Sequence, residues 1–85
     1  METKSQQIAE CMKAEEYVRV NANRVKIAYG DRYIAVRSTG IVDSDTDEFE
    51  LAARIERYYP NNSVLIGNIE RILNPEKLFM GGPHN

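Results

Sequence analysis

Apolar and polar residues alternate through residues 17–38, which read YVRVNANRVKIAYGDRYIAVRS. Alternation with a period of two is typical of strands, because successive side chains point to opposite faces of a sheet. Gly30 and Asp31 separate two alternating runs and suit a two-residue hairpin turn, with the glycine providing the positive φ. The pattern therefore predicts an antiparallel hairpin in this segment.

The register of this hairpin sorts the side chains onto two faces. With residues 30–31 as the loop, Ile27 faces Ile34 and Val25 faces Val36, and both pairs lie on the same side of the sheet. A one-residue slip would mix apolar and polar positions, so the sorting supports the turn. A chemically weaker turn at residues 22–23 would add an earlier strand in the same register. We predict a three-stranded antiparallel meander.

The opposite face of the predicted sheet carries cations and tyrosines. Its members are Tyr17, Arg19, Arg24, Lys26, Tyr33 and Arg37. Arg24 would lie directly across from Arg37, and a like-charge pair at such a position costs a few tenths to about 1 kcal/mol. A docked anion would relieve this cost; the alternative is a solvated face whose arginines splay apart. We take these six residues as the candidate binding site.

Residues 3–16 are expected to form a helix. Thr3 and Gln6 have the spacing of a capping box. Four residues follow at helical spacing and predict a buried stripe: Ile8, Cys11, Met12 and Glu15. We interpret Cys11 as a small core residue, because a reactive thiol needs a nearby cation or histidine and the single histidine, His84, lies at the other end of the chain.

Residues 43–50 form an acidic run with two interpretations. The alternate aspartates have the spacing of a calcium loop, but Glu48 stands where that loop needs glycine and Arg54 where it needs glutamate. The alternative is the start of a helix, with Asp45 as N-cap and acidic side chains at the positive end of the helix dipole. We favour the cap and leave open whether the run is also a contact surface.

Two helices are expected after this run, over residues 46–59 and 64–73. An ion pair between Glu50 and Arg54 would support the first of them. Residues 63–67 fit either the start of the second helix, capped by a serine, or a short strand, and both alternatives stay open. The expected fold is α+β: an N-terminal helix, the meander, and two C-terminal helices packed on one face of the sheet.

At 85 residues the chain is expected to form a single domain over residues 1–80, with a last turn at 76–80 and a flexible tail at 81–85. A core of this size is close to the lower limit for stability, so a homodimer is one expectation. The net charge is −2, but residues 17–38 hold five basic residues and one acidic one, whereas residues 43–50 hold five acidic residues and no basic one. Such separation affects the choice of partner.

The sequence contains no recognisable catalytic or ligand-binding motif. One cysteine and one terminal histidine do not by themselves supply a zinc site, and no glycine-rich phosphate loop is present. We therefore predict a non-enzymatic protein with no cofactor and no metal. The longest apolar run is four residues, too short for a membrane span or the core of a signal peptide, so we expect a cytoplasmic protein without a membrane partner.

The expected order of elements resembles the layout of the double-stranded-RNA-binding domain. That domain opens its second helix with lysines that contact phosphates, whereas this chain has Asp47, Glu48 and Glu50 there, which would repel phosphate. A similar layout with an added terminal helix is also found among small phage-encoded inhibitors such as some anti-CRISPR proteins, without a shared residue motif.

Three functional hypotheses follow. In the first, the chain is a non-catalytic inhibitor or adaptor, the phage anti-defence type included, whose charge-segregated surface binds a protein or nucleoprotein partner. In the second, the sheet face binds nucleic acid, with Tyr17 and Tyr33 stacking on bases and the cations holding phosphates. In the third, the basic face of one copy docks on the acidic run of another.

Overall fold

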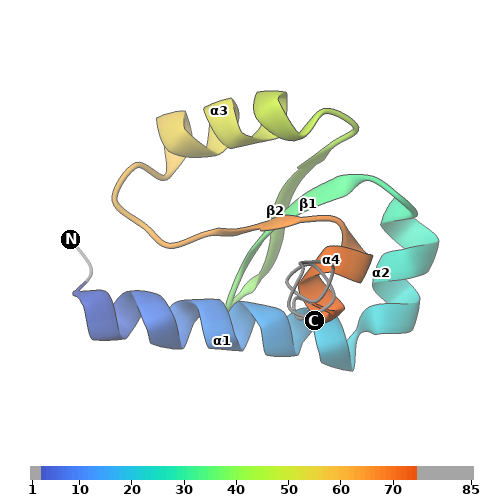
Figure 1. The fold of residues 1–85 in the computed structure, drawn as a ribbon, viewed down its shortest axis with the longest axis horizontal. Helices are drawn as coiled ribbons and strands as arrows, with labels where there is room; N and C mark the ends of the chain where they lie inside the picture. Colours follow the sequence, from blue (N-terminus) through green and yellow to red (C-terminus); the bar gives the residue numbers. More distant parts are fainter. Residues whose placement is uncertain (1–2, 75–85) are drawn as a thin grey trace, which may run out of the picture.

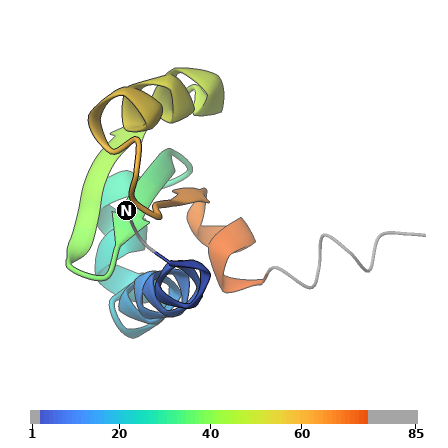
Figure 2. The same ribbon diagram turned by 90° about the vertical axis from the view of Figure 1, so that its left-hand side faces the viewer.

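The computed structural model describes residues 3–74, in which a small sheet is enclosed by helices on both of its faces (Figures 1 and 2). The elements in chain order are α1 (Lys4–Val20), α2 (Ala22–Tyr29), β1 (Tyr33–Arg37), β2 (Gly40–Asp45), α3 (Glu48–Tyr58), β3 (Leu65–Gly67) and α4 (Ile69–Leu73). The sheet is antiparallel with strand order β2-β1-β3. The predicted α+β class, with a leading helix and a three-stranded antiparallel sheet, is confirmed, although α3 lies between β2 and β3 and the strand order is not that of a meander.

The first two strands of the predicted meander are wrong, because residues 17–29 are helical. Thr3 starts α1 with the predicted capping box, and the helix continues to Val20 without a glycine or proline to stop it. Ala14, Val18 and Val25 are spaced by four and seven residues and are all buried, so the segment also carries a helical pattern. The segment fits both the alternation of a strand and the periodicity of a helix, and in the structure it is helical.

Asn21 and Gly30 make the corners that the hairpin turns were expected to make. The backbone N–H and the side-chain Nδ2 of Asn21 donate to the Tyr17 carbonyl oxygen at 3.0 and 2.9 Å, which ends α1. The Asn21 carbonyl oxygen then accepts the first bond of α2, from the Val25 N–H at 2.9 Å. Gly30, at φ 59°, ends α2 with its N–H bonded to the Lys26 carbonyl oxygen.

The sheet forms around β1, which pairs with β2 on one side and with β3 on the other. Tyr33 lies opposite Asp45 at one end of the β1–β2 hairpin, and the register shifts between Ala35 and Val36. On the other edge Ile34 pairs with Gly67. The strand alternative for residues 63–67 is therefore correct over Leu65–Gly67. A short helix does follow, but Asn68 caps it instead of a serine, with its Oδ1 accepting from the Arg71 N–H at 2.8 Å.

The helices divide between the two faces of the sheet, which corrects the prediction that both C-terminal helices share one face. α1, α2 and α4 cover the face that carries Ile34 and Val36. α3 covers the face that carries Ala35, through Leu51 and Ile55. The two helical layers on either side of the sheet are visible in Figure 2. The middle strand β1 is buried from both sides.

The N-terminal half of α1 extends beyond the sheet (Figure 1), and none of the four residues of its predicted stripe is fully buried. Ile8 is 56% exposed and Met12 is 65% exposed, whereas Ala14 and Val18, further along the helix, are fully buried. Cys11 is partly buried. None of the helices within residues 3–74 is both long enough and apolar enough to cross a bilayer. The turn and tail expected at residues 76–80 and 81–85 lie outside the described residues.

A pair of alanine substitutions tests the helical assignment of residues 17–29. Ile34 is fully buried, so Ile34→Ala should lower the free energy of unfolding by about 2–5 kcal/mol. Ile27 is 87% exposed, so Ile27→Ala should change it by no more than about 0.5 kcal/mol. Chemical denaturation measures both values. Equal losses would favour the predicted hairpin, in which these two isoleucines face each other.

Candidate interaction surface

The six residues of the predicted binding site do not share a face in the structure. Arg19 lies in the last turns of α1 and Arg24 and Lys26 lie on α2, and all three are exposed. Tyr17, Tyr33 and Arg37 are partly buried and belong to other surroundings. The structure therefore brings three of the cations to one corner of the fold and separates them from the tyrosines.

Tyr17 and Tyr33 lie against opposite faces of the sheet. Tyr17 packs with the helices on the Ile34 side, and its ring lies 3.5 Å from where a Cβ on Gly40 would stand. Tyr33 packs on the Ala35 side, with the Arg71 guanidinium 5.6 Å from its ring centroid. The two rings cannot act as one stacking platform for bases.

Arg37 connects β1 to its neighbours instead of facing Arg24. Its Nε lies 3.6 Å from a carboxylate oxygen of Glu10 on α1, and its guanidinium lies 6.0 Å from the ring centroid of Tyr59. The same Glu10 oxygen accepts a 2.6 Å hydrogen bond from the Ser38 N–H. Glu10 and Arg37 therefore hold the end of β1 against α1, and the predicted repulsion between two arginines does not arise.

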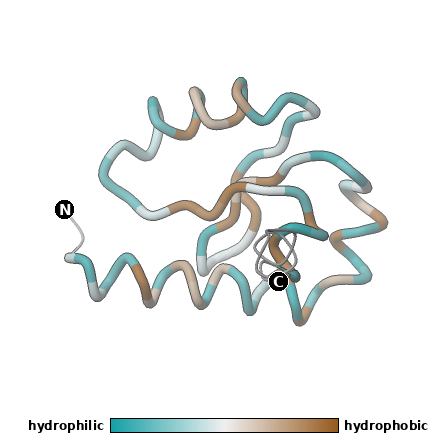
Figure 3. Tube along the Cα trace, viewed as in Figure 1, coloured by the Kyte–Doolittle hydropathy of each residue, from teal (hydrophilic) through white to brown (hydrophobic). Residues whose placement is uncertain are grey.

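The exposed residues where α1 meets α2 form a mixed apolar and cationic surface, which we call the α1–α2 corner. It consists of Arg19, Val20, Arg24, Lys26 and Ile27. Val20 is 72% exposed and Ile27 is 87% exposed, the two most exposed large aliphatic side chains among the described residues. Ile27 points away from the buried Val25, with Arg24 and Lys26 on either side of it around the helix. Hydrophobic and hydrophilic stretches follow one another along both helices (Figure 3).

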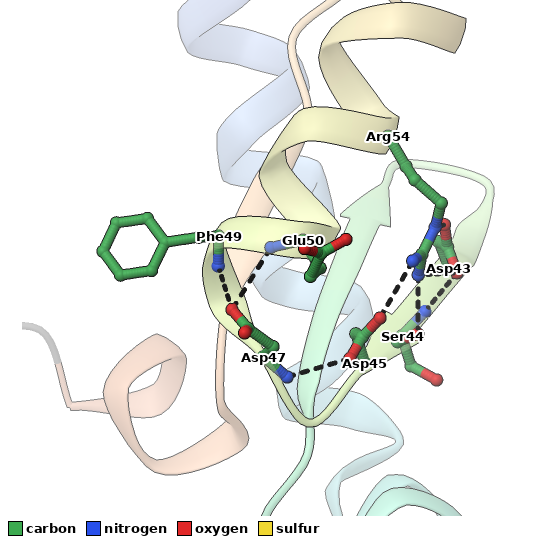
Figure 4. A network of polar contacts seen from close by, with 7 residues as sticks. All are labelled: Asp43, Ser44, Asp45, Asp47, Phe49, Glu50 and Arg54. Atoms are coloured by element: carbon green, nitrogen blue, oxygen red, sulfur yellow. Dashed lines mark hydrogen bonds and ion pairs between the residues drawn. The ribbon is translucent and has the colours of Figure 1, made fainter.

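The acidic run is held together by Arg54, as Figure 4 shows. The Arg54 Nε and Nη2 donate to the two carboxylate oxygens of Asp43 at 3.0 and 3.2 Å, and its Nη1 donates to Asp45 at 2.9 Å. Nη2 also donates to the Ser44 carbonyl oxygen at 3.1 Å. The predicted ion pair between Glu50 and Arg54 is therefore wrong, because the guanidinium is directed at β2.

The N-cap of α3 is Asp47, two residues later than predicted. One of its carboxylate oxygens accepts from the N–H groups of Phe49 and Glu50 at 2.9 and 3.2 Å. Asp45, the expected cap, instead accepts from the Asp47 N–H at 2.9 Å and so shapes the turn before the helix (Figure 4). No group of three or more acidic, histidine or cysteine side chains within residues 3–74 is placed to hold a metal ion.

The contacts of Arg54 lower the pKa values of both aspartates. For Asp43 the hydrogen bonds from Arg54 are the main cause, and burial opposes them. For Asp45 the main cause is the Asp47 N–H, followed by Arg54. On the same side of the fold, Glu48 accepts two hydrogen bonds from Arg71, at 2.7 and 3.3 Å, which raise the pKa of that arginine. Three carboxylates of the acidic run thus bind arginines of the same chain, and a fourth, that of Asp47, caps α3.

A groove of about 590 Å³ lies between the N-terminal half of α1 and the β3–α4 segment. Most of its lining is apolar: Ile8, Cys11, Met12, Leu65, Ile66 and Ile72. Glu15 and Arg71 are among its polar lining residues. The helical spacing of Ile8, Cys11 and Met12 predicts core positions, whereas in the structure these residues line the groove. Nothing in the sequence showed that the helix would extend past the sheet.

No known protein family, curated protein or solved structure matches the chain. Two features of the described surface stand out: the α1–α2 corner, and the apolar groove between α1 and the β3–α4 segment.

The engagement of Arg54 with Asp43 and Asp45 predicts a specific loss of stability in acid. Because both pKa values lie below the ordinary 3.8, the unfolded chain binds more protons than the folded chain as the pH falls, and the stabilisation present above pH 3.8 is lost. Arg54→Gln should therefore flatten the dependence of unfolding free energy on pH below this value. Urea titrations across the acid range measure it. Arg57→Gln, on the same helix, is the control and should keep the wild-type slope.

Proposed function

We propose that this chain is a non-catalytic binding protein, an inhibitor or adaptor, that docks its α1–α2 corner on a protein partner. The observation that carries this proposal is the exposure of Ile27 and Val20 among Arg19, Arg24 and Lys26. Protein interfaces combine a central apolar contact with a polar rim, and arginine is enriched in them. The corner has this composition.

The charge of the corner indicates what the partner surface should be. The corner holds three cations, Arg19, Arg24 and Lys26, of which Arg19 forms an ion pair with Glu15 at 2.6 Å. Such a surface fits a patch with acidic residues around an apolar contact, and complementary charge would speed encounter and reject basic partners. The acidic run of a second copy is a poorer match, because Asp43, Asp45 and Glu48 already bind arginines of their own chain.

Nucleic acid is the alternative partner of the same cations. Exposed Arg24 and Lys26 suit phosphate contacts, but single-strand binding also draws on aromatic stacking. Tyr17 and Tyr33 lie on opposite sides of the sheet and cannot supply that stacking together. The exposed aliphatic side chains at the centre of the corner favour a protein surface over a nucleic acid.

The double charge reversal Arg24→Glu/Lys26→Glu should weaken binding of the partner by about tenfold or more, since it replaces attraction to an acidic patch by repulsion. The matched control is Lys4→Glu/Arg57→Glu, which reverses two exposed cations elsewhere on the described surface. We first select proteins that wild type and control capture from the cells of origin and the corner variant does not. Each selected protein is then purified, and its dissociation constant is measured with all three forms.

Gel shifts with single-stranded DNA, RNA and duplex DNA at low and moderate salt separate the two partner classes. We expect no salt-sensitive shift with any of them. If a nucleic acid is shifted by the wild-type protein but not by the corner variant, the partner is nucleic acid and the proposal of a protein partner is wrong. If all three forms capture the same proteins, the α1–α2 corner is not the binding site.

A further inference from the structure

The two edges of the sheet differ in how well they are protected. β2 carries Asp43 and Asp45 and lies opposite a shift in register, features that discourage pairing with another strand. β3 is short, with three residues, but it carries no charge that would discourage pairing, since residues 60–68 contain no charged side chain. Within residues 3–74, backbone hydrogen bonds join β3 to no strand other than β1. The outer edge of β3 is therefore open to a further strand.

The apolar groove lies beside this open edge. Leu65 and Ile66 of β3 form one wall of the groove, and Ile8 and Met12 of α1 form the other. A strand added beyond β3 would cover the groove and shield both α1 side chains from water. Unpaired backbone groups next to an apolar groove are the requirements for recognition by strand addition.

We infer that the added strand is β3 of a second copy, so that the chain forms a symmetric dimer with a continuous sheet. An uncharged strand can pair with an antiparallel copy of itself without placing like charges opposite each other. α4 projects past the β3 edge on the α1 side of the sheet (Figure 2). The two-fold axis that pairs the β3 strands therefore brings α4 of each copy toward the groove of the other.

A dimer of this kind would also supplement a small core. The large side chains that are fully buried within the described residues are Ile34, Leu51, Val18 and Val36. Burying Ile8 and Met12 from each copy would add four more apolar side chains to a shared interior. This inference does not depend on the proposed function, because the α1–α2 corner lies outside the groove.

Sedimentation of the full chain over a wide range of protein concentration tests the inference. Wild type should form a dimer, and Met12→Lys should raise its dissociation constant by about tenfold or more, because a charge would be buried in the interface. Ile27→Lys is the matched control: it places the same charge on a more exposed isoleucine away from the groove, and should leave the dimer intact. Circular dichroism should show both variants folded, since both positions are exposed.

Amide hydrogen exchange locates the interface. The amides of residues 65–67 should be protected more strongly in the wild-type dimer than in Met12→Lys, while amides of β1 stay protected in both. A monomer at every concentration, or a dimer that Met12→Lys leaves unchanged, would overturn the inference. A dimer without added protection at β3 would equally refute strand pairing.

Discussion

The burial of β1 between two layers of helices is the constraint on which the rest of the structure depends. Ile34 and Val36 point to one layer and Ala35 to the other, and all three are fully buried. A chain of this length gains a sufficient core only by using both faces of its sheet. Consequently α1, α2 and α4 occupy one side and α3 the other, and the outer surfaces of α1 and α2 are exposed.

Electrostatic contacts within the chain decide which charges remain available. Arg54 and Arg71 engage carboxylates of the acidic run, and Arg37 engages Glu10. The two arginines that neutralise the acidic run lie outside residues 17–38, and these contacts join α3 to β2, α4 to α3 and α1 to β1. At the α1–α2 corner Arg19 pairs with Glu15 at 2.6 Å, whereas Arg24 and Lys26 are exposed, and these two cations support the proposal of a protein partner.

The sequence predicted the class of the fold because several signals were local. The capping box at Thr3 and the strand pattern of residues 33–37 depend on near neighbours and were read correctly. The assignment of residues 17–29 failed because Val18 and Val25 fit both a strand pattern with Ile27 and a helical pattern with Ala14, and only packing against β1 distinguishes the two. The same limit applies to the site, since pairs such as Arg54 with Asp43 form between segments whose approach no local pattern encodes.

The central claim is that residues 17–29 form two helices that turn Arg24, Lys26 and Ile27 outward. Nuclear magnetic resonance of the full chain tests it most directly, through backbone chemical shifts and short proton–proton distances in this segment. The account predicts helical shifts with contacts between residues three apart, interrupted at Asn21. Cross-strand contacts between Ile27 and Ile34 with extended shifts would contradict it, and with it the α1–α2 corner.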